Sequence, residues 1–568
     1  MNFLGQPLWA IMLVSVGFGQ ISISGNAYVG YGKSTNDFNF SEDRVDLNGY
    51  WNNWTGWLQF ELADPPQLGR DVKGLRKFRV EYSKNSYTIK FGDLYEFWGK
   101  GLVMNMVDDQ AINFDTGIRG ILVSWSNDKY YYDALGGTQE IWRSSNQVVG
   151  FDDRVPNYGI DNKMVGGRAG MMFDQSFIEF QLLNVNEDHP NPGTKITENI
   201  SHKLYGINFN YFGKSSDFSI ELAKKDRNGS GIYGDGNIYL GPWSIGLSYK
   251  NYLFASLSPY ERWDFVNNTG GALTLQQMPT VFKEHNTSLL GKITHIIDYN
   301  DELGFHLRAE GPLFAETMLA IHYSQSSRHN EWVMDQNWEW EKSESKKIHP
   351  STDPLYNPFK EYFAEINGYA LDNKFYYVIG YARTEDVVDI YLNRASDVYR
   401  SYSYEFLEAK TIPTHFTYRL GNLYSIDILF EYQEKKKGVK LFSNYPELGQ
   451  DLFDSLYLND KQINRFISLG VAKSPRWSAT LSVDYSNTDE RIVIDNDRKN
   501  NAIEKALDTL WDTSLTWANF EMVFNVNQKT RLSLSYGSQR GGVFCSNGVC
   551  RYIQPFENGY KLGIISSF

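Results

Sequence analysis

The sequence lacks the features that mark a helical membrane protein or a chain of several domains. It has 568 residues, yet beyond the N-terminus no apolar run approaches the about 20 residues that a membrane-spanning helix needs. It shows no linker, no low-complexity tract and no second domain. Two classes stay open, a soluble globular protein and a barrel that crosses a membrane with β-strands.

Positive charge is in deficit. Lys and Arg number 55 against 68 Asp and Glu, which gives a formal net charge of -13. Proteins that bind nucleic acid through counterion release need an excess of basic residues, so we expect no nucleic-acid partner. Acidic loops either bind divalent cations weakly or keep the surface solvated, and the sequence leaves both readings open.

Catalytic motifs are missing as well. The chain has no Gly-x-Ser-x-Gly elbow and no His-Glu-x-x-His pair, and its nine histidines are scattered. Glu284 and His285 are adjacent, so they would point to opposite faces of a strand. We expect no catalytic residues, no cofactor and no enzyme activity. An outer-membrane hydrolase whose site is assembled across strands is the least favoured alternative.

Cysteine is nearly absent, with Cys545 and Cys550 the two in the chain. The Ser-Asn-Gly between them is typical of a turn, and exported proteins oxidise. We therefore expect a disulfide that fixes one tight loop, with less stabilisation than the about 3 kcal/mol of a 15-residue loop. No histidine lies close enough in sequence to complete a zinc site, so no metal is expected.

The N-terminus carries one short apolar run, residues 8–18, followed by Gly19 and Gln20. This run is too short to span a membrane and predicts a secretory signal peptide over residues 1–19, with the barrel over residues 20–568. No Lys or Arg precedes the run, which departs from the usual signal. A buried first strand is the alternative.

Aromatic residues are abundant, with 38 Tyr, 35 Phe and 15 Trp, although the mean hydropathy is -0.45. Apolar and polar residues alternate from Ile21 onward, which predicts strands with one lipid-facing side. A soluble sandwich also alternates. Aromatic strand ends favour the barrel, because they suit girdles at the two membrane interfaces. The expected girdle residues are Trp51, Trp54, Trp57, Tyr130, Tyr131, Tyr132 and Trp243.

The strands come in pairs joined by short polar turns and separated by longer segments. This asymmetry is typical of bacterial barrels with short periplasmic turns and long extracellular loops. We predict an all-β fold, a large antiparallel transmembrane β-barrel of about 24 strands (22–26), in the bacterial outer membrane. Residues 287–324 resist assignment to either side. The expected long segments include residues 32–45, 138–163, 253–285, 325–358, 384–411 and 434–460.

The last ten residues form an alternating strand in which Tyr560, Leu562, Ile564 and Phe568 share one face. Ser566 is the polar exception. This pattern predicts an insertion signal for the barrel-assembly machinery. The expected partners are therefore outer-membrane lipid and that machinery, with a periplasmic or surface protein as a further candidate.

Three blocks carry a resemblance to a known family: residues 92–102 with 115–120, residues 278–285, and residues 536–551 with 565–568. Together they resemble an uncharacterised family of outer-membrane barrel proteins typical of Bacteroidota-like diderm bacteria, catalogued as a domain of unknown function. The resemblance covers nearly the whole mature chain. It implies the fold and the location, and it supplies no substrate.

Residues 92–120 are the best functional candidate, because glycines and charges lie together between two strands. Folded inward near residues 97–117, this loop would narrow the pore and filter solutes electrostatically. The alternative is an outer loop paired with wall arginines such as Arg79 and Arg168. The segment around Trp332 and Trp340 is a second inward candidate, or a surface that binds sugar or a partner. The putative constriction residues are Asp93, Glu96, Lys100, Asp108, Asp109, Asp115 and Arg119.

A barrel of this width needs inward loops, a flattened section or a partner to fill it. We expect a porin-like channel for small polar solutes. The alternative is a closed barrel that serves binding, surface display or the anchoring of a complex.

Overall fold

The computed structural model describes most of the chain from residue 21 to residue 568. The predicted signal peptide, residues 1–19, lies outside the described residues. The undescribed positions are 1–20, 36–37, 111, 144, 146–154, 192, 227–228, 255–270, 315, 335–339, 343–346, 393–400, 444–460, 488–500, 512–514, 547–548 and 554.

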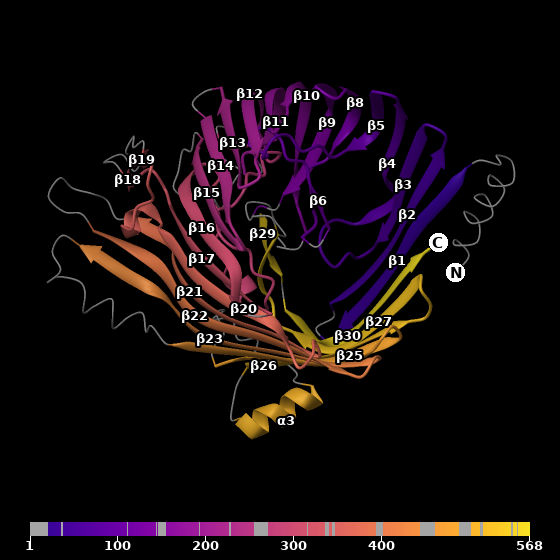
Figure 1. Ribbon diagram of the computed structural model, residues 1–568, viewed down its shortest axis with the longest axis vertical. Coiled ribbons are helices and arrows are strands. Elements are labelled where there is room, and N and C mark those ends of the chain that lie inside the picture. The colour runs from indigo at the N-terminus through magenta and orange to yellow at the C-terminus, as the bar shows by residue number, and fades with distance from the viewer. Residues whose placement is uncertain are drawn as a thin grey trace.

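Twenty-four antiparallel strands form one closed sheet, which confirms the predicted fold class. Each strand pairs with its neighbours, and the last strand pairs with the first, so the sheet has no free edge (Figure 1). The barrel strands are β1 (Ser22–Ser34), β2 (Asn39–Trp51), β3 (Trp54–Ala63), β4 (Val72–Lys84), β5 (Tyr87–Leu94), β8 (Ile118–Ser126), β9 (Tyr130–Arg143), β10 (Tyr158–Phe173), β11 (Ser176–Pro190), β12 (Thr197–Phe212), β13 (Ser216–Lys225), β14 (Gly229–Leu240), β15 (Trp243–Leu253), β16 (Asp301–Phe314), β17 (Thr317–Ser327), β20 (Phe359–Ala370), β21 (Phe375–Leu392), β22 (Ser401–Leu420), β23 (Tyr424–Ser443), β24 (Gln462–Lys473), β25 (Trp477–Ser486), β26 (Leu515–Asn525), β27 (Thr530–Gln539) and β30 (Phe556–Ser567).

The connections contain a few small elements. Three two-stranded sheets pair β6 with β7, β18 with β19 and β28 with β29. Within the described part of the chain, no helix combines the length and the apolar character needed to cross a membrane. The small elements are β6 (Asp108–Asp109), β7 (Phe114–Asp115), β18 (Trp332–Met334), β19 (Trp340–Lys342), β28 (Gly542–Ser546), β29 (Val549–Ile553), the 3-10 helices η1 (Leu290–Ile293) and η2 (Pro354–Tyr356), and the helix α3 (Ala502–Trp511).

The strands present apolar side chains outward and polar side chains inward. In β13, Ile220 and Leu222 are exposed on the outer face, whereas the intervening Glu221 is fully buried inside. A closed sheet with an outward apolar band satisfies its backbone groups and matches lipid, as a membrane barrel must. The protein is a β-barrel of the bacterial outer membrane.

Several predicted loops are largely strand. Residues 32–45 were expected to form a long connection, but β1 and β2 extend through most of it and leave residues 35–38. The same holds at 384–411, where β21 and β22 continue far into the segment. Polar outer strand ends resemble loops in sequence, because neither face of a strand beyond the bilayer needs to be apolar.

The structure resolves the uncertain region around residues 287–324. Gly311 and Pro312 lie within β16, and the turn to β17 comes after Phe314. Residues 287–300 contain no strand. They belong to a segment inside the barrel, which is described below.

Two of the seven expected girdle residues were assigned to the wrong face. Trp57 donates its indole N–H to Asp46 of the inner wall (3.2 Å), and Tyr131 donates its hydroxyl hydrogen to the buried Glu179. Trp51, Trp54 and Tyr132 are exposed, as expected. In a run of three consecutive aromatics such as 130–132, the middle ring must point inward, because side chains alternate.

Candidate functional site in the barrel lumen

Residues 95–117, the first inner segment, connect β5 to β8 and lie inside the barrel. The backbone N–H of Lys100 donates to Glu221 of β13, which faces inward. The carbonyl oxygen of Phe97 accepts a hydrogen bond from Arg168 Nη1 of β10 (3.1 Å). Two separate parts of the wall therefore hold the backbone of this segment.

Gly99 permits this close approach to the wall. Its φ is +57°, and a Cβ placed there would lie 2.5 Å from the Gln181 amide nitrogen and 2.8 Å from Glu221. A side chain at position 99 would therefore clash with the wall residues and strain the backbone. The glycine allows the wall carboxylate to reach the loop backbone.

Residues 271–300, the second inner segment, connect β15 to β16 and cross the lumen. Glu431 of β23 accepts the backbone N–H groups of Ser288 and Leu289, both at 2.7 Å. Further on, Lys292 Nζ lies 2.7 Å from Asp484 of β25. The segment thus starts at β15 and is anchored on strands of the opposite wall.

The two inner segments form one body, here called the plug. Gln276 donates to the carbonyl oxygen of Leu102 (2.6 Å), and the N–H of Asn105 donates to Leu275 O (2.8 Å). A buried apolar cluster joins both segments to the inner wall formed by β5 and β8–β15. Its fully buried members include Leu94, Trp98, Leu102, Val103, Met104, Leu183, Tyr252 and Leu275.

A buried charge network fixes the second inner segment. His295 lies between Asp386 (3.1 Å) and Glu302 (3.4 Å), and Lys250 Nζ lies 2.5 Å from Glu302. Burial alone would lower the pKa of His295, but the two carboxylates outweigh it and raise that pKa to about 9. The imidazole is therefore charged at neutral pH and bridges two wall strands, β16 and β21.

The putative constriction residues lie where the first inner segment meets the wall, and most are paired there. Lys77 of β4 contacts both Asp108 and Asp115, each at 2.7 Å. Asp93 pairs with Arg119 (3.1 Å). The remaining members follow: Glu96 lies 3.0 Å from Lys90, Lys100 is held through its backbone, and Asp109 lies in the β6–β7 pair.

These ion pairs neutralise much of the charge on the residues that were predicted to form an electrostatic filter. Arg168, the wall arginine of the alternative reading, does contact the segment, although through a backbone carbonyl group. An electrostatic filter at these residues stays a prediction. The inward position of the segment is a geometric fact of the structure.

Three cavities with many polar lining residues lie in the lumen beside the apolar cluster. One of about 680 Å³, the plug–wall cavity, lies between residues 284–294 of the plug and the inner faces of β24–β27. Another of about 850 Å³, the seam cavity, lies along β1, β2 and β30. A third of about 500 Å³, the notch cavity, includes Arg76, Lys77 and Asp115 in its lining.

These cavities adjoin one another. Gln539, Arg540 and Ile553 line both the plug–wall and the seam cavity, and Asp71 lines both the seam and the notch cavity. The seam cavity extends from Ser34, at the end of β1 that carries the long connections, to within a few residues of the other end of β30. The seam cavity shares no lining residue with the apolar cluster of the plug.

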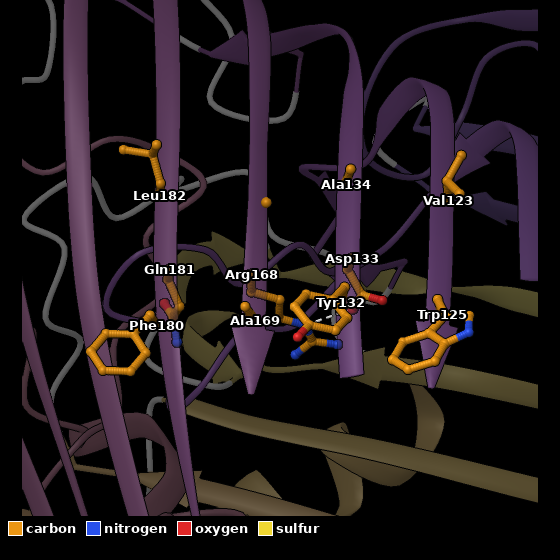
Figure 2. Close-up of a pocket in the computed structure, with 11 residues that line it drawn as sticks. Val123, Trp125, Tyr132, Asp133, Ala134, Arg168, Ala169, Phe180, Gln181 and Leu182 are labelled. Atoms are coloured by element: carbon orange, nitrogen blue, oxygen red, sulfur yellow. Dashed lines mark hydrogen bonds and ion pairs between the residues drawn. The ribbon is translucent and has the colours of Figure 1, made fainter. Parts of the chain in front are cut away.

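A groove on the outer surface faces lipid and is separate from these cavities. It crosses β8–β11, measures about 550 Å³ and has Gly167 and Ala169 of β10 as its floor. Figure 2 shows Trp125 and Tyr132 on one side of the floor and Phe180 on the other. Such an apolar surface suits the acyl chains of the bilayer.

Comparison with known families gives a clear assignment. The pattern that defines DUF6029, a family of unknown function, matches residues 31–568. The chain belongs to DUF6029. No curated protein matches the sequence of this DUF6029 barrel.

Solved structures with a similar arrangement include three named transport proteins or receptors. The copper transporter OprC has 9% identity and a TM-score of 0.42, with 97% of this chain and 81% of that chain covered. The FrpB iron transporter from Neisseria meningitidis has 8% identity and a TM-score of 0.39, covering 98% and 84%. The ferric enterobactin receptor PfeA from Pseudomonas aeruginosa has 8% identity and a TM-score of 0.42, covering 96% and 80%.

Sequence reasoning missed the second inner segment and its wall anchors. Residues 278–285 stood out only through the family resemblance, and neither Glu431 nor Asp484 carried a signal of its own. A carboxylate at an inward strand position is the available clue, because such a charge needs a partner when it is buried. The partner itself lies more than 140 residues away in both cases.

Other predicted sites have mixed outcomes. Cys545 and Cys550 are opposite one another in the β28–β29 ladder, but their side chains lie outside the described part, so the disulfide stays a prediction. In the second inward candidate, Trp332 is buried, and Trp340 lies in β19, which pairs with β18. Among the described residues, no group of three or more His, Cys, Asp or Glu is placed to hold a metal ion.

Proposed function

We propose that this DUF6029 barrel passes small polar solutes across the outer membrane through the space beside the plug. The main observation behind this proposal is that the plug–wall cavity and the seam cavity adjoin and share Gln539 and Arg540 in their linings. A lumen that keeps polar, charged walls on one side suits selective passage. The plug closes the other side and limits the size of what can pass.

The second candidate is a closed barrel that binds a partner or displays its loops. The buried apolar cluster between plug and wall favours it, because a packed plug resists displacement. The two candidates differ in whether solvent and ions traverse the seam cavity. Conductance separates them directly.

The test is single-channel conductance of the purified, folded protein in a planar bilayer, with Gln539→Trp as the main variant. We expect steady conductance in the wild type and a clear reduction in Gln539→Trp, because the larger ring would fill the junction of the two cavities. Leu534→Trp, on the outer face of the same strand, is the matched control and should conduct normally. Silence in all three proteins would reject passage and favour the closed barrel.

A further inference from the structure

We propose that the plug–wall cavity is a binding site for an uncharged, hydroxyl-rich solute of oligosaccharide size. This inference rests on the proposed function, which supplies the route by which the solute enters the barrel. It adds the chemical class of that solute. Plug residues form one side of the cavity and strands β24–β27 form the other. Its volume of about 680 Å³ falls within the about 300–1,000 Å³ of small-molecule sites.

The cavity presents many neutral groups that both donate and accept hydrogen bonds. Asn286 and Thr287 come from the plug, and Ser482, Asn519 and Gln539 come from the wall. Hydroxyl and amide side chains match the hydroxyl groups of a sugar, which are themselves donors and acceptors. The rings of Phe466 and Trp517 supply apolar surface in the same lining.

One of these hydroxyl groups has no partner within the described structure. Thr287 Oγ1 is shielded from solvent and makes no hydrogen bond there, although the residue lines the cavity. A buried hydroxyl without a partner costs free energy. A bound polyhydroxylated solute would supply the missing partner.

The charges around the cavity disfavour ions. Lys292 and Arg540 of the lining both lie against Asp484, at 2.7 and 3.2 Å, and His285 lies 3.0 Å from Glu361. They are therefore already engaged, and none offers a free cation for a phosphate or carboxylate group. Glu521 adds a carboxylate to the same lining, which repels anions.

Isothermal titration calorimetry on the folded protein in detergent tests this inference without requiring conduction. The probes are three neutral trisaccharides (raffinose, maltotriose and cellotriose) and the anionic trimer of galacturonic acid. We expect at least one neutral trisaccharide to bind at one site per chain and the anionic trimer to bind at least about tenfold more weakly, because like charges repel.

Two variants locate the site. Thr287→Val keeps the shape and removes a hydroxyl that has no protein partner, so the fold should tolerate it, and Asn519→Leu removes a wall amide. Each should weaken trisaccharide binding about three- to tenfold, the equivalent of one hydrogen bond. Thr88→Val on β5, away from the cavity, is the control and should bind as the wild type does.

The inference is overturned if no neutral trisaccharide binds, if the anionic trimer binds equally well, or if both site variants bind normally. A barrel that conducts but gives no binding heat contradicts this inference alone. A silent barrel that binds a trisaccharide contradicts the proposed passage and leaves the binding site in place.

Discussion

Single wall carboxylates hold the plug by its backbone. Glu221 accepts the N–H of Lys100, and Glu431 accepts two consecutive N–H groups at Ser288 and Leu289. Each bond gives an amide group of the plug an acceptor inside the barrel, and leaving such a group without one costs about 1–3 kcal/mol. The plug, having almost no regular secondary structure, cannot pair these amide groups internally.

Replacing Glu221 tests this anchoring. Glu221→Leu leaves the N–H of Lys100 without its acceptor. We therefore expect the free energy of unfolding, measured in urea, to fall by about 1–3 kcal/mol. Glu221→Gln retains an acceptor oxygen and should lose clearly less stability. Equal unfolding free energies for the wild type and Glu221→Leu would show that the hydrogen bond does not hold the loop.

His295 makes plug anchoring depend on pH. Its pKa is about 9 in the fold against 6.5 in the unfolded chain, so its stabilisation is complete below about pH 6.5 and disappears as pH rises through 9. The melting temperature should therefore fall between pH 7 and pH 10 more steeply in the wild type than in His295→Gln. Melting followed by heat-modifiable gel migration measures this, and parallel curves would rule out the His295 contribution.

At the scale of elements, local patterns determined the barrel strands and could not determine the plug. Alternation at period two identified strands such as β23 and β25, because lipid requires one apolar face. The same pattern gave no indication that Lys292 meets Asp484 of β25, 192 positions away. Contacts between an irregular segment and a distant strand produce no periodic pattern in the sequence. The plug–wall cavity, which such contacts enclose, could therefore not be predicted.

The first inner segment can be removed as an element. Deleting residues 98–114 should raise conductance, because the apolar cluster against β5 and β8–β15 would lose its centre and water would enter. The melting temperature should fall at the same time, since wall residues such as Leu183 and Leu204 would become exposed. A Gly/Ser stretch of equal length in place of residues 98–114 is the control for chain length. Unchanged conductance in the deletion would place the segment outside the limiting part of the pore.

The whole molecule is asymmetric about its axis. The main apolar cluster of the plug packs against β5–β15, whereas the plug–wall and seam cavities lie against β24–β27 and the seam between β1 and β30. Both termini of the barrel thus border the open side (Figure 1). Closure of the sheet and the shape of the seam cavity are therefore coupled, because Tyr28 and Ile565 are paired across the seam and line that cavity.

Phe568 completes this closure. Its N–H donates to Gly25 O at 3.0 Å, and its carbonyl oxygen accepts from Gly25 N–H at 3.1 Å. Deleting Phe568 removes both bonds, each worth about 0.5–1.5 kcal/mol, and one aromatic ring from the face that carries the predicted insertion signal. We expect a smaller folded fraction in membranes, measured by heat-modifiable migration, whereas Phe568→Tyr should fold normally. Insertion of the deletion variant at the wild-type level would contradict both the seam argument and the signal, since each depends on this residue.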